Sequence, residues 1–148
     1  MTNLNRELPT NRRKPSGSAG LYLLADWLKE RVEDPGYCHE HFTSPGVMHA
    51  NDLLNTCGTS ACALGHVPTI PQFQKRGWRL RHYCGDPGQP LRGRCGGSIA
   101  SARVEFGITR AQYSRVFGFQ GCVGFDTTRT EIIAAIRKLA DELRADGR

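Results

Sequence analysis

Two thiols and one imidazole lie within ten residues of this chain, in the stretch Cys57-Gly58-Thr59-Ser60-Ala61-Cys62-Ala63-Leu64-Gly65-His66. We expect a short helix from about Ser60 to His66, because Thr59 or Ser60 can act as an N-cap and accept a bond from a free backbone N–H group. Cys62 and His66 are four residues apart and would share one face of that helix, while Cys57 would precede its N-terminus. This arrangement suits a metal site, an activated thiol or a close-packed helix of small residues.

Zinc is the metal that this motif would bind, because zinc takes thiolate and imidazole ligands in a tetrahedron. Cys57, Cys62 and His66 would supply three ligands. Buried free thiols or a single structural cysteine pair are the favoured alternative, because the chain lacks the Cys-x-x-Cys pair typical of structural zinc sites. The candidates for the fourth ligand are Cys38, His39, His41, Cys84 and Cys95.

A cysteine nucleophile is the enzymatic interpretation of the same motif. A helix dipole stabilises a thiolate at the helix N-terminus, which would make Cys57 reactive. Papain-like enzymes place the histidine base far downstream of the cysteine, with an orienting Asn or Asp. Only His82 follows the motif in this chain, so a non-enzymatic role is favoured. The candidates for the base are His39, His41, His49 and His82.

Basic residues alternate with apolar residues in the segment 77–95, which predicts a β-hairpin. Trp78 and Leu80 would face the core on the first strand, and Gly85-Asp86-Pro87-Gly88 is a turn sequence. An arginine-rich outer face can follow a nucleic-acid backbone, and a tyrosine there can stack on a base. A solvated strand edge protected by charge is the alternative. The expected outer face consists of Arg79, Arg81, Arg92, Arg94 and Tyr83.

A second basic cluster lies near the N-terminus, at Arg12, Arg13 and Lys14. Residues 1–19 contain mainly Asn, Pro, Arg, Ser and Gly, so we predict a flexible basic arm, followed by one globular domain over residues 20–148. The arm would order on a nucleic acid or a protein partner. A solvated tail without a partner is the favoured alternative.

The bulk composition fits one domain and an acidic partner. The chain has 148 residues and a net charge of +6, which favours partners such as DNA or RNA. No apolar run resembles a signal peptide or is long enough to cross a bilayer, so we expect a cytoplasmic protein without a membrane partner. Its six cysteines are therefore not expected to form disulfides. Residues 93–97 lack the Lys and Ser/Thr that complete a phosphate-binding P-loop.

The remaining elements are expected to be helical. Apolar residues recur at helical spacing from about Ala19 to Glu33. A short helix over Ser98–Phe106 should carry Ile99, Ala102 and Phe106 on one side, and capping boxes predict two further helices that start after Thr109 and Thr128. The expected fold is a mainly α domain of four to five short helices with an inserted β-hairpin at about 77–95.

Three segments together carry a recognisable combination of patterns. Residues 57–66 read Cys-Gly-Thr-x-x-Cys-x-x-Gly-His, residues 106–117 read Phe-Gly-Ile-Thr-x-x-x-Tyr-x-x-Val-Phe, and a Thr-capped helix follows at 128–143. With the amphipathic helix at 21–32, they resemble a family of small bacteriophage and bacterial proteins that have no established activity. The resemblance implies a phage or prophage origin. It also argues against a ligand role for His66, because similar proteins carry Trp at that position.

We therefore expect a phage-type accessory or structural protein that binds another macromolecule and is not an enzyme. It would act in the host cytoplasm, or in the virion if it is a structural component. Its partner would be a protein or a phage or host assembly, with DNA or RNA as the alternative. Two other hypotheses stay open: a zinc-stabilised nucleic-acid-binding protein that uses the arginine-rich hairpin, and a cysteine-dependent enzyme with Cys57 as nucleophile.

Overall fold

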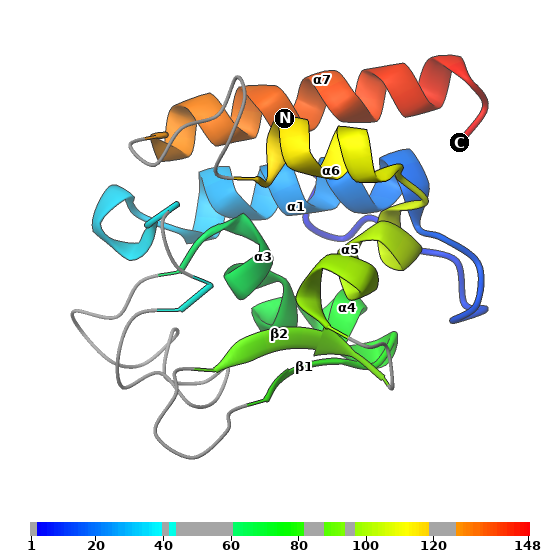
Figure 1. Ribbon diagram of the computed structural model, residues 1–148, viewed down its shortest axis with the longest axis horizontal. Coiled ribbons are helices and arrows are strands. Elements are labelled where there is room, and N and C mark those ends of the chain that lie inside the picture. The colour runs from blue at the N-terminus through cyan, green and yellow to red at the C-terminus, as the bar shows by residue number, and fades with distance from the viewer. Residues whose placement is uncertain (1–2, 40–41, 44–60, 82–87, 94–96, 119–126) are drawn as a thin grey trace.

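Two long helices form the upper layer of the molecule. The computed structural model describes residues 3–39, 42–43, 61–81, 88–93, 97–118 and 127–148. Helix α1 (Gly17–Arg31) packs along α7 (Arg129–Ala145), and the shorter helices α5 (Ser98–Phe106) and α6 (Arg110–Val116) lie against them (Figure 1). This arrangement confirms the predicted mainly helical fold.

The lower layer holds the short elements and the hairpin. Helices α3 (Ala63–His66) and α4 (Pro71–Lys75) are joined by the 3-10 turn η2 (Val67–Thr69), and a second such turn, η1, spans Asp34–Gly36. Strands β1 (Trp78–Arg81) and β2 (Gln89–Arg92) pair in antiparallel fashion and form the predicted hairpin below α3 and α4 (Figure 1).

The main core lies between α1 and α7. Its leucines and isoleucines recur every three or four residues, so each helix turns one apolar face toward the other. Full burial of such a side chain stabilises the fold by roughly 1.5–3 kcal/mol. The fully buried members are Leu21, Leu24, Leu28, Ile132, Ile136, Leu139 and Leu143.

Both predicted capping boxes are present. Thr109 and Thr128 each accept a bond from the backbone N–H three residues later, and the Gln112 and Glu131 side chains bond back to the threonine backbone. These reciprocal bonds satisfy donors that a helix start leaves open, which is why local sequence was sufficient to place both starts.

Two of the helix predictions need correction. Helix α1 covers Gly17–Arg31 rather than 19–33, so it begins inside the segment predicted as an arm. Helix α5 has the predicted bounds, and of the three apolar residues expected on one side Ala102 and Phe106 are buried, whereas Ile99 is 49% exposed. The inner face of α5 carries Ser101 and Glu105 beside Ala102 and Phe106, because polar partners on other elements receive these two side chains.

The helix of the cysteine motif starts later than predicted. Cys62 occupies the N-cap position of α3, so neither Thr59 nor Ser60 caps it. Ala61 is instead paired with Tyr37 in a parallel bridge, and its carbonyl accepts a bond from the Cys38 N–H at 3.0 Å. This long-range pairing keeps residue 61 extended and delays the helix by one turn.

Candidate functional site

The described part of the cysteine motif, residues 61–66, packs against residues 36–38 and Phe42. The Nε2 atom of His66 lies 2.8 Å from the Gly36 carbonyl, and because a carbonyl can only accept, Nε2–H donates. A Cβ atom on Gly65 would lie 1.6 Å from the Phe42 carbonyl oxygen. The glycine therefore lets two backbones approach closely.

Burial keeps the reactive groups of this half uncharged at neutral pH. Burial lowers the pKa of His66 to about 4 and raises the pKa of the Cys62 thiol to about 11. Burial also lowers the pKa of His39, whose Nδ1 accepts from the Tyr37 hydroxyl at 2.8 Å while Nε2 faces the Gly118 carbonyl. These contacts are those of tightly packed side chains.

The zinc and nucleophile hypotheses stay predictions. Among the described residues, no three His, Cys, Asp or Glu side chains gather into a metal site. Cys57 lies outside the described residues, so neither hypothesis is tested at its central residue. The other proposed partners outside these residues are His41, His49, His82, Cys84 and Cys95.

The hairpin divides its arginines between two faces. In the register, Trp78 lies opposite Arg92, and directly opposed residues point to the same side of a sheet. Trp78 faces the core, so Arg92 does too, and it is only 6% exposed. Its predicted outward position is therefore wrong. Arg79 and Arg81 are exposed as predicted, while Tyr83 and Arg94 lie outside the described residues.

A buried carboxylate explains the inward arginine. Glu105 of α5 is fully buried and receives the Arg76 guanidinium, with Nε 2.9 Å from Oε2 and Nη2 2.8 Å from Oε2. The Trp78 indole N–H donates to Oε1 at 2.8 Å, and the Arg92 Nε lies 3.7 Å from the same oxygen. One carboxylate therefore joins α4, the hairpin and α5.

The same Arg76 fastens the N-terminal segment to the body of the protein. Its Nη1 donates to the carbonyl of Pro9 and its Nη2 to the carbonyl of Lys14, and the Asn11 carbonyl lies 3.4 Å from Nη1. The Ser16 N–H donates to the Glu105 carbonyl at 2.6 Å. The segment predicted as a free arm therefore runs across the junction between α4 and β1.

Further contacts hold the start of this segment. The Gln72 side chain donates to the Leu4 carbonyl at 2.6 Å, the Arg6 guanidinium lies 5.0 Å from the centre of the Tyr22 ring, and Leu8 packs on the core. Residues 3–16 thus form part of the domain surface.

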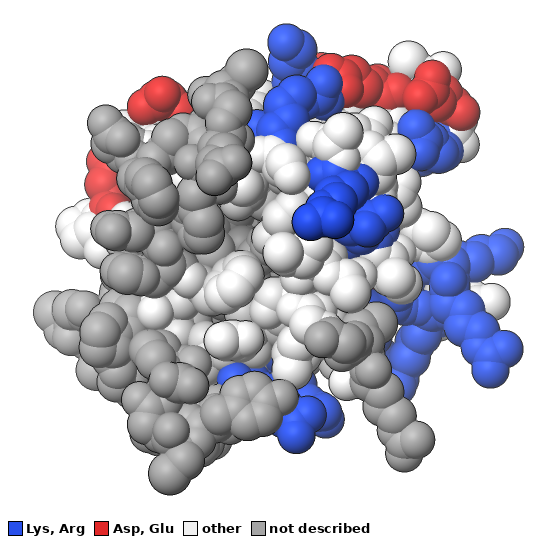
Figure 2. All heavy atoms as spheres, viewed as in Figure 1, with Lys and Arg blue, Asp and Glu red and all other residues white. Residues whose placement is uncertain are grey.

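This fastening brings two predicted clusters onto one surface, which we call the basic strip. Lys75 adjoins Arg76 in sequence, and Arg79 and Arg81 follow on the outer side of β1. In Figure 2 cationic side chains lie along the right and lower edges, with others at the top and in the middle of this face, and acidic side chains lie at the upper right and upper left. The basic strip consists of the exposed residues Arg12, Arg13, Lys14, Lys75, Arg79 and Arg81.

Electrostatically, the basic strip is largely uncompensated. Arg12, Arg13, Lys14, Lys75 and Arg79 form no ion pair with any residue that the structure describes. Exposed like charges that are held close together attract anions from solution. The strip can therefore bind a polyanion.

Sequence reasoning missed the two residues that build this surface, Arg76 and Glu105. A weak signal existed for Glu105, because it stands between Ala102 and Phe106 on the inner face of the expected helix. The sequence contains no signal for the role of Arg76, since its partners are the Glu105 carboxylate on another element and backbone carbonyls more than 60 residues away in sequence.

The described residues include no helix that is both long and apolar enough to span a membrane. Comparison of the chain with protein-family models, with curated proteins and with solved structures yields no significant match.

Proposed function

We propose that this protein binds a nucleic acid through the basic strip and is not an enzyme, in the manner of an accessory or structural phage protein. The observation that carries the proposal is the hold of buried Arg76 on the segment from Pro9 to Lys14. These hydrogen bonds bring the cations of residues 12–14 and those of residues 75–81 to one surface in the unbound protein. A pre-ordered surface loses less conformational entropy on binding than a free arm.

A nucleic-acid backbone fits this surface because its charge is regularly repeated. Each phosphate that a cation neutralises releases counterions, so binding weakens as salt rises, with a slope of about −0.9 per contact in duplex DNA. Five contacts, one for each residue of the basic strip other than Arg81, would give a slope of about −4.5 in a plot of log affinity against log salt. Exposed arginine suits phosphate because its planar guanidinium donates two parallel bonds.

The test measures binding to duplex DNA, single-stranded DNA and RNA over a series of salt concentrations. A triple variant, Arg12→Gln/Arg13→Gln/Arg79→Gln, should bind more weakly and reduce the salt slope by about 3. The matched control, Lys29→Gln/Lys138→Gln/Arg144→Gln, removes three exposed cations from α1 and α7 and should retain the wild-type slope.

Two results would contradict the proposal. One is the absence of salt-sensitive binding by the wild-type protein to all three nucleic acids. The other is an equal loss of affinity in the control, which would mean that net charge rather than the basic strip determines binding.

A further inference from the structure

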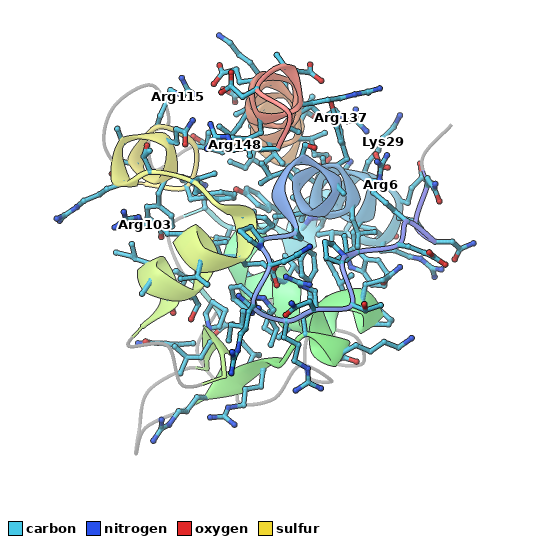
Figure 3. The ribbon with its side chains drawn as sticks, turned by 90° about the vertical axis from the view of Figure 1, so that its right-hand side faces the viewer. Arg6, Lys29, Arg103, Arg115, Arg137 and Arg148 are labelled. Carbon is cyan, nitrogen blue, oxygen red and sulfur yellow. The ribbon has the colours of Figure 1, made fainter. Side chains whose placement is uncertain are left out.

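A surface hollow of about 480 Å³ lies beside the N-terminus of α5, away from the residues of the basic strip. We call it the α5 hollow. Its wall includes the first turn of α5, one arginine each from α5 and α6, and Phe42. Figure 2 shows cationic side chains between α5 and α6 on this face, and Figure 3 shows Arg103 on the opposite side of the view from Arg6 and Lys29.

The first turn of α5 supplies unpaired donors to the hollow. The backbone N–H groups of Ser98, Ile99 and Ala100 have no acceptor among the described residues, as expected for the start of a helix. Gly97 holds the N-cap position and has no side chain that could cap them. Such N–H groups, together with the helix dipole, favour an anion at this point.

A buried hydroxyl lies at the same place. Ser98 lines the α5 hollow and is only 6% exposed, and its Oγ has no hydrogen-bond partner among the residues that the structure describes. A buried polar group without a partner costs about 1–3 kcal/mol. The hydroxyl is therefore a second donor that the fold leaves available, independent of the helix start.

Two arginines complete the charge of the site. Arg103 and Arg110 line the hollow, are exposed, and form no ion pair with any residue that the structure describes. Phe42 and the half-exposed Ile99 add an apolar part to the same wall. The hollow thus joins an anion-binding end to an apolar surface.

We propose that the α5 hollow binds a phosphomonoester whose organic group lies against Phe42 and Ile99. A monoester has three unesterified oxygens and carries about −1.5 to −2 charges at pH 7. This matches three N–H groups, one hydroxyl and two guanidinium groups better than a diester, which has two such oxygens and one charge. The site is separate from the basic strip and does not depend on nucleic-acid binding there.

The test titrates the full chain with phenyl phosphate, inorganic phosphate and diphenyl phosphate, and follows the amide NMR signals of Ser98, Ile99 and Ala100. Phenyl phosphate should shift these signals and bind more tightly than either other probe. Arg103→Gln and Arg110→Gln should each weaken phenyl phosphate binding roughly tenfold, the loss expected for one charge-assisted hydrogen bond. The control Arg144→Gln, an exposed arginine on α7, should bind as the wild type does.

A small substitution at Ser98 separates binding from folding. Ser98→Ala removes the unpartnered hydroxyl, so it should keep or raise the melting temperature while weakening phenyl phosphate binding. Affinity should also fall below pH 6, where the ligand loses its second charge.

Several outcomes would overturn the assignment. Unchanged amide signals at millimolar phenyl phosphate would remove the site. Equal binding of diphenyl phosphate would exclude a monoester, and equal binding of inorganic phosphate would exclude a role for the apolar wall. The triple variant of the basic strip should bind phenyl phosphate normally, so failure of one proposal is distinguishable from failure of the other.

Discussion

Replacing Glu105 by alanine should destabilise the protein strongly, because its buried carboxylate pairs with two buried arginines. The carboxylate is the one acidic group that pairs with Arg76 or Arg92 among the described residues, and these arginines are only 4% and 6% exposed. Its removal leaves two buried cations without compensation. Removing one partner of a buried ion pair costs about 3–5 kcal/mol.

This cost can be measured by urea unfolding followed by tryptophan fluorescence. A loss of 3–5 kcal/mol corresponds to a fall in melting temperature of roughly 6–20 °C for a chain of this size. The N-terminal segment should also become more sensitive to protease, because Glu105 orients the Arg76 guanidinium that holds Pro9 and Lys14.

Two further variants make the result decisive. Glu142→Ala breaks the Arg115–Glu142 pair, whose side chains are 44% and 37% exposed, and should cost no more than about 1 kcal/mol. Glu105→Gln keeps an acceptor for Trp78 but removes the charge, so a loss of roughly 1.5–3 kcal/mol is expected. If Glu105→Ala fails to fold, the glutamine variant supplies the measurement. A loss below about 1 kcal/mol in both Glu105 variants would refute the reasoning.

Two other predictions concern the cysteine motif. The pKa of His66 is about 4 in the folded state and about 6.5 in the unfolded state, so the unfolded state binds more protons between these two pH values. The free energy of unfolding should therefore fall as the pH drops from 6.5 to 4, by up to roughly 1.4 kcal/mol per pH unit. His66→Gln keeps a donor for the Gly36 carbonyl and should reduce this pH dependence, measured by urea unfolding at pH 7 and pH 4.5. His39, whose pKa is also lowered, accounts for the pH dependence that remains. An unchanged pH dependence would contradict the lowered pKa of His66. Gly65→Ala should lower the free energy of unfolding by about 1–3 kcal/mol, because the new Cβ would meet the Phe42 carbonyl. In the same unfolding assay the control Gly36→Ala, whose new Cβ has its nearest contact at 3.5 Å, should change the free energy of unfolding by no more than about 0.5 kcal/mol. Equal stability of the two glycine variants would show that the Phe42 carbonyl does not approach Gly65 closely.

Local signals in the sequence were sufficient for most of the helical fold. The capping boxes at Thr109 and Thr128 act over three residues, and the apolar spacing of α1 and α7 is a property of each helix alone. The bounds of α5 and the existence of the hairpin follow from turn residues in the same way.

Features that depend on distant partners were not predictable. The inward position of Arg92 depends on Glu105, which belongs to another element. The late start of α3 depends on the pairing of Ala61 with Tyr37. Periodicity reports where apolar residues recur, but it does not report whether a charge has a buried partner.

The same limit applies to the candidate surfaces. Composition identified Arg12, Arg13, Lys14, Arg79 and Arg81 as cations available for a partner, but only the contacts of Arg76 place them together. The α5 hollow had no sequence signature, because its donors are mainly backbone N–H groups and one unpartnered serine.

The way Arg76 holds the N-terminal segment bears on how this surface could evolve. Its guanidinium bonds to the main chain at Pro9, Asn11 and Lys14 and makes no demand on their side chains. Substitutions at residues 10, 12, 13 and 14 can therefore change the charge and shape of the surface while the path of the backbone stays fixed, whereas the Asn11 side chain accepts a bond from the Arg13 N–H and contributes to that path. Selection for a new partner could act there without first having to rebuild the fold.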